Sequence, residues 1–166
     1  TWLGTGEGIR PGKDSKTIVI KIPSERRFRH NYDIEKEEDE FDKVTILRTE
    51  WLPVDYENKD FASLGLRVNI IFDEKNVLPL AIWEVGVSAK RYQFLGRKSP
   101  RFQVLGGETS YELPQGKTER SIERGYTSEI IKGITGLDVF VKIVLENKVK
   151  ARIGDTELEF DRRHLE

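Results

Sequence analysis

The segment Ser63–Asp73 (SLGLRVNIIFD) constrains the fold more than any other part of the chain. Its apolar residues recur at every second position, and one face carries Leu64, Leu66, Val68, Ile70 and Phe72. A period of two is the period of a β-strand with one buried face. Such a strand needs neighbouring strands for its backbone and a second layer over its apolar face, so the segment predicts a layered β-protein.

Other segments fit the same architecture. Strands are predicted at Thr17–Ile22, Val44–Leu52, Leu78–Ser88, Arg91–Leu95, Arg101–Leu105, Thr109–Leu113, Leu137–Glu146, Val149–Ile153 and Thr156–Phe160. Arg91–Leu95 and Arg101–Leu105 are expected to pair as a hairpin across the glycine and proline between them. Asn147-Lys148 and Gly154-Asp155 are expected to be two-residue turns that join the last three strands into a meander.

A single short helix is predicted over 127–135. Thr127 can act as its N-cap and Gly136 as its C-terminal stop, although Gly133 weakens the segment.

About nine short strands and one helix favour an all-β fold, a two-layer antiparallel β-sandwich. The alternative is a closed eight-stranded β-barrel. The strand-like run after Trp2 is short and interrupted by glycines, which disfavours the barrel.

The length of 166 residues suits one domain with its own core. We expect a flexible glycine-rich arm at 1–16, a single β-sandwich domain at 17–161 and a tail at 162–166, whose last residues resemble a cloning remnant. The acidic stretch 31–43 is expected to be irregular.

Composition excludes several classes of site. The chain has no cysteine, which removes disulfides, thiolate metal sites and thiol nucleophiles. No apolar run reaches the length of a membrane helix, so a soluble protein is expected, in a compartment that the sequence does not specify. The net charge of −1 makes nucleic acid an unlikely partner. No cofactor, metal site or catalytic residue is predicted.

A basic region interleaved with aromatics is the main candidate for binding. No acidic residue lies between Glu84 and Glu108. The candidate residues are Lys90, Arg91, Tyr92, Arg97, Lys98 and Arg101. Charge and stacking could bind an anionic ligand there. The alternative is a solvated hairpin whose cations protect sheet edges from aggregation.

Charge is also concentrated elsewhere. The run Asp33–Asp42 holds seven carboxylates and one lysine, which could attract Ca²⁺, but no EF-hand spacing is present and a solvated loop is the simpler interpretation. Arg26, Arg27, Arg29 and His30 form a second basic cluster. Acidic and basic segments could also pair with each other, within one molecule or between two.

Glu84 lies within an apolar strand. If buried, its carboxyl would have a raised pKa and could act as a general acid. The alternatives are an exposed position at a kink near Gly86 or a pairing with an arginine such as Arg67.

Several weaker patterns point to core structure rather than to a site. Trp51, Trp83, Tyr92 and Tyr111 could form a stacking platform for sugars, but aromatic residues in strands more often lie in the core. The glycines near the start of the chain match neither a phosphate loop nor a dinucleotide fingerprint.

These features favour a non-catalytic β-sandwich domain that binds a protein or an anionic ligand. One alternative is a carbohydrate-active hydrolase or glycan-binding module that uses Glu84 and a second carboxylate. Another is a structural subunit that forms a homo-oligomer through exposed strand edges.

Overall fold

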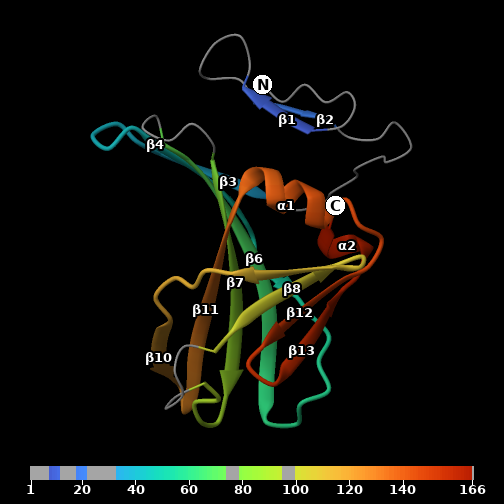
Figure 1. Ribbon diagram of the computed structural model, residues 1–166. Helices are drawn as coiled ribbons and strands as arrows, with labels where there is room; N and C mark the ends of the chain where they lie inside the picture. Colours follow the sequence, from blue (N-terminus) through green and yellow to red (C-terminus); the bar gives the residue numbers. More distant parts are fainter. Residues whose placement is uncertain (1–7, 12–17, 22–32, 74–78, 95–99, 166) are drawn as a thin grey trace.

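The computed structural model describes residues 8–11, 18–21, 33–73, 79–94 and 100–165 (Figure 1). They form thirteen strands and two short helices. The predicted all-β class is therefore confirmed.

Three antiparallel sheets are present. The large sheet has the order β10 (Glu119–Glu123), β11 (Tyr126–Gly136), β7 (Leu80–Ala89), β6 (Phe61–Asp73), β4 (Val44–Thr49) and β3 (Ile34–Asp39), and β5 (Leu52–Pro53) also pairs with β6. The small sheet has the order β13 (Thr156–Phe160), β12 (Val149–Ile153), β8 (Phe102–Gly106) and β9 (Thr109–Leu113). A separate two-stranded sheet joins β1 (Gly8–Pro11) to β2 (Ile18–Lys21).

The core lies between the large and small sheets, which pack across each other in Figure 1. Trp83, Val85 and Val87 point inward from β7 and are almost fully buried, as are Phe102 and Val104 of β8. The terminal strands of the large sheet, β10 and β3, are not paired with each other. The architecture is therefore an open sandwich, and the closed barrel is not formed.

The helix predicted over 127–135 is a strand instead. These residues belong to β11, which pairs with β7 from Thr127 opposite Ala89 to Gly136 opposite Leu80. Along β11, buried residues that point inward alternate with half-buried ones. The buried positions include Thr127, Glu129 and Gly133, so the sequence does not show an apolar residue at every second position. The long backbone ladder with β7 outweighs the local helix signals.

The one substantial helix, α1 (Leu137–Val144), occupies a segment that the sequence predicted to be a strand. Its β-branched residues favour a strand, but Leu137 and Val141 also lie one helical turn apart. The helix buries both of them, and Phe140 packs edge-on against Trp83 with ring centroids 5.1 Å apart. Tertiary packing against the end of the core therefore decides the conformation.

The structure forms an element near each end of the chain. Gly8–Pro11, expected within a flexible arm, forms β1. The short helix α2 (Arg162–Leu165) replaces the expected tail, because Leu165 is buried in the core and the His164 ring lies 2.8 Å from the Pro53 carbonyl oxygen.

The two main sheets approach closely at Gly133. A Cβ atom at this position would lie 2.8 Å from Leu113 Cδ2 and 3.0 Å from Phe102 Cγ. We therefore expect Gly133→Ala to lower the free energy of unfolding by about 1–3 kcal/mol, because overpacking displaces both core side chains. Urea unfolding measures this, with the exposed Lys117→Ala as control. Equal stability of the two variants would contradict the close approach.

Candidate functional site

The predicted basic hairpin does not form. Lys90–Phe94 follows β7 without strand structure, whereas β8 pairs with β9 and β12. Lys90 and Arg91 are exposed, and Tyr92 is half-buried. Arg101 is exposed and forms an ion pair with Glu112, with 3.4 Å between Nε and Oε1. Arg97 and Lys98 lie outside the described residues, so anion binding by the six predicted residues stays a prediction.

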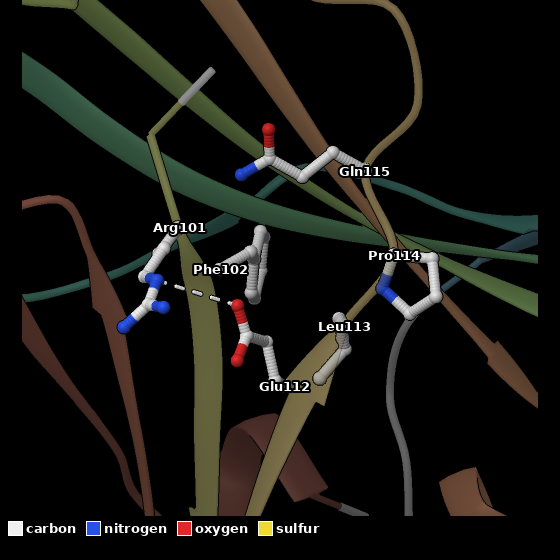
Figure 2. A pocket seen from close by; sticks show the side chains of 6 residues that line it. All are labelled: Arg101, Phe102, Glu112, Leu113, Pro114 and Gln115. Atoms are coloured by element: carbon white, nitrogen blue, oxygen red, sulfur yellow. Dashed lines mark ion pairs between the residues drawn. The ribbon is translucent and has the colours of Figure 1, made fainter. Parts of the chain in front are cut away.

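Arg101 borders an open surface depression of about 370 Å³. Figure 2 shows the Arg101–Glu112 pair on one side and Pro114 and Gln115 on the other. Phe102 and Leu113, both almost fully buried, complete the lining. Among the described residues of this lining, the only cation is Arg101, and it already faces a carboxylate.

A buried carboxylate determines the path of the chain after β7. Glu129 of β11 is 1% exposed, and its Oε2 accepts hydrogen bonds from the backbone N–H groups of Gln93 (2.6 Å) and Phe94 (3.1 Å). Its Oε1 accepts a hydrogen bond from Arg120 Nε at 3.2 Å. Through these hydrogen bonds, Glu129 holds the irregular segment after β7 against the large sheet. This segment includes Lys90, Arg91 and Tyr92.

Glu84 lies at the centre of the large sheet, on the face opposite the core. The strand registers place Arg67 and Lys132 directly beside it, on β6 and β11. Arg67 Nε lies 2.6 Å from Glu84 Oε2, and Lys132 Nζ lies 3.3 Å from Oε1. Lys132 Nζ also lies 2.5 Å from Glu119 Oε1. The predicted pairing of Glu84 with Arg67 is confirmed.

The electrostatic environment keeps Glu84 ionised. Burial by itself raises the pKa of the Glu84 carboxyl. Hydrogen bonds from Arg67 and Asn69, with the charges of Arg67 and Lys132, outweigh burial and bring its pKa below the ordinary value of 4.5. A general acid needs the opposite shift, so the expectation of a raised pKa is wrong.

Trp51 lies on the same outer face. A Cβ atom on Gly86 would lie 3.0 Å from two ring atoms of Trp51, and one on Gly65 would lie 3.3 Å from a third. The guanidinium carbon of Arg67 is 4.4 Å from the ring centroid. The indole thus covers a glycine pair in adjacent strands and stacks with a cation, which explains why a tryptophan is only 39% exposed at the surface.

The four candidate aromatics do not form a common platform. Trp83 is buried in the core and Tyr111 packs against the core cluster, so the core interpretation is confirmed for these two residues. Trp51 lies on the opposite face of the large sheet from Trp83.

The acidic stretch is a hairpin rather than an irregular loop. Ile34–Asp39 forms β3, which pairs with β4 from Ile34 opposite Thr49 to Asp39 opposite Val44. All six side chains of β3 are exposed, because hydrogen bonding to β4 forms the strand without any burial of its side chains. We call residues 34–43, from β3 through the turn that follows it, the acidic arm. Figure 1 shows the hairpin extending away from the two-sheet core.

Phe41 is at the tip of the acidic arm and is 99% exposed. The turn is held by Asp39, whose Oδ1 accepts hydrogen bonds from the backbone N–H groups of Phe41 (2.9 Å) and Asp42 (3.0 Å). Along the arm, a hydrogen bond and the charge of Lys36 lower the pKa of Glu38. The tip therefore presents one large apolar side chain in a defined turn, next to ionised carboxylates.

A row of apolar side chains leads to the arm across the outer face. The registers align Leu80, Ile71 and Ile46, and the row ends at Glu37 of β3. Leu80 is exposed, and the two isoleucines are half-buried. Neither Phe41 nor this row was predicted from the sequence as a site. The only indication in the sequence was that Phe41 stands between two acidic residues, Glu40 and Asp42.

Among the described residues, no group of three or more histidines, aspartates or glutamates is arranged to hold a metal ion. In the same part of the chain, no helix is long and apolar enough to span a membrane. Comparisons with protein-family models, with curated proteins and with solved structures found no significant match.

We expect Glu84→Gln to lower the free energy of unfolding by about 3 kcal/mol at neutral pH, because Arg67 and Lys132 lose a buried counter-ion. The lowered pKa means that this stabilisation is present above the ordinary value of 4.5 and is lost as pH falls through the folded-state pKa. The stabilities of wild type and variant should therefore converge in acid, as urea unfolding at several pH values would show.

The matched control is Glu157→Gln, which removes a carboxylate from an exposed cross-strand pair with Arg152. Solvent screens that pair, so a much smaller loss is expected. A constant difference between wild type and Glu84→Gln at every pH would contradict the role of ionised Glu84.

Glu129→Ala should speed hydrogen exchange at the amides of Gln93 and Phe94, which lose their acceptor, relative to amides of β12. Glu129→Gln retains an acceptor oxygen and should preserve more of the protection. Exchange at both amides that is the same in Glu129→Ala as in wild type would show that Glu129 does not hold this segment.

Proposed function

We propose that this chain is a non-catalytic β-sandwich domain that recognises a protein partner through its acidic arm. The observation that carries the proposal is Phe41, a large apolar side chain 99% exposed at the tip of a hairpin. Its turn is held by Asp39, so the exposed position is part of the folded structure.

The chemistry of the arm suits a protein surface. Full burial of a phenylalanine side chain contributes about 1.5–3 kcal/mol, and exposed aromatic residues are frequent anchors of protein interfaces. The surrounding carboxylates would attract a basic partner and orient it before contact. A partner with a small apolar pocket rimmed by lysine or arginine matches both features.

The other predicted functions have less support. Among the described candidates for anion binding, Lys90 and Arg91 lie outside any hairpin and Arg101 is already paired with Glu112. A hydrolase would need a general acid, and the pKa of Glu84 is lowered rather than raised. In the part of the chain that the structure describes, the acidic arm is the one feature that combines exposure, defined geometry and a clear chemical preference.

The test compares affinity capture from an extract of the source cells using wild type, Phe41→Ser and Ile122→Ser. Ile122 is 69% exposed on β10, at the opposite edge of the large sheet, and serves as the matched control. A protein retained by wild type and by Ile122→Ser is then purified and titrated. We expect Phe41→Ser to weaken its binding at least tenfold, which is about 1.4 kcal/mol.

Binding that is unaffected by Phe41→Ser would overturn the role of the arm. Sedimentation of the purified protein at several concentrations tests whether the chain associates with itself. If wild type forms a dimer that Phe41→Ser abolishes, the partner is a second copy of the chain.

A further inference from the structure

We propose that the partner adds a β-strand to the free edge of β3, and that this strand carries lysine or arginine at every second position. The inference rests on the proposed function and specifies how the acidic arm is recognised. It follows from the position of β3 in the sheet and from the alternation of its side chains.

Among the described residues, no strand pairs with the outer edge of β3. β3 is the last strand of the large sheet, and only β4 pairs with it among the described residues. One side of its backbone therefore has N–H and C=O groups that no described strand uses. Such an edge is a template for an extended segment of another protein, whose main chain supplies affinity and whose side chains supply specificity.

The side chains of β3 select the charge of the added strand. Glu35, Glu37 and Asp39 share the outer face of the sheet, because Glu37 lies opposite Ile46 in the row that leads to Leu80. Glu37 already forms an ion pair with Arg48 of β4, with 3.7 Å between Oε2 and Nη2, so this face of the arm carries three carboxylates against one cation. Like charges directly opposite each other destabilise a strand pair, whereas opposite charges stabilise it. The β3 edges of two copies would therefore repel, and a strand with cations on its outer face would be favoured.

The other face of β3 explains why the partner needs cations only at alternate positions. It presents Ile34, Lys36 and Glu38, of which Lys36 and Glu38 already form an ion pair with each other. Ile34 is 51% exposed and offers an apolar contact. Residues of the added strand on this face therefore need no cation, and apolar β-branched side chains suit a strand there.

The experiment uses the full chain and a short capped peptide in which lysine alternates with valine. Backbone amide hydrogen exchange and chemical shifts are followed during titration. We expect exchange to slow at least tenfold at alternate amides of β3, because strand addition protects only those that point outward. Amides of β10, at the other edge, serve as an internal reference.

Two control peptides separate strand pairing from charge attraction. A lysine–valine peptide that is N-methylated at every residue has the same charge, but its methyl groups block both edges of the strand, so it should not protect β3. A glutamate–valine peptide should not bind. Equal protection by the native and N-methylated peptides, or protection of β10 rather than β3, would overturn the inference.

Variants then connect the peptide to the natural partner. Replacing Glu35 and Glu37 together by lysine should weaken peptide binding at least tenfold, and Glu108→Lys, in the exposed turn before β9, should leave it unchanged. Glu37→Pro tests whether the captured partner binds the edge of β3. If the proline prevents folding, the variant with lysine at both 35 and 37 is used instead.

Failure of the inference can be distinguished from failure of the proposed function. If Phe41→Ser abolishes partner binding while both β3 variants retain wild-type affinity, the arm is the contact but strand addition is wrong. If neither Phe41→Ser nor the β3 variants affect the partner, the proposed function itself is wrong.

Discussion

A carboxylate buried in the centre of the large sheet needs cations beside it, and this requirement ties three strands together. Glu84 of β7 is 4% exposed and is held between Arg67 of β6 and Lys132 of β11. A register slip of one residue would move these groups to opposite faces and leave a charge unpaired in an apolar layer. The register also places Trp83, Val85 and Val87 in the core, so the charged face and the apolar face depend on one pairing.

The rest of the architecture follows from this central ladder. β7 and β11 are long enough to carry the core on one face, and Gly133 lets Phe102 of the small sheet approach closely. At the other side, β6 continues past the core and pairs with β4, whose six residues are all half-buried. The large sheet thus extends past the small one and presents β3 at its margin, where an exposed hairpin is stabilised mainly by its hydrogen bonds.

The residues that the proposed function uses lie on that extension, away from the buried charges. The charges of Glu84 and Glu129 are satisfied by neighbouring strands and by the backbone of Gln93 and Phe94, which is a structural role. The acidic arm, in contrast, orders its turn through Asp39 and leaves Phe41 in solvent. The hydrogen bonds of Asp39 therefore order a turn that exposes an apolar side chain, and this supports the proposed role of the arm in recognition.

The sequence by itself determined the all-β class, the alternation of Ser63–Asp73 and the turn at Gly154-Asp155, and it offered the pairing of Glu84 with Arg67 as one of several alternatives. These depend on local periodicity, on turn residues and on the cost of an unpaired buried charge. Only the tertiary structure decided that 126–136 is a strand and 137–144 a helix, because both segments carry mixed local signals and pairing with β7 or packing against Trp83 resolves them. It also decided the hairpin fold of the acidic stretch and the exposure of Phe41, since β3 is formed by hydrogen bonds to a strand whose place in the sheet no local pattern encodes.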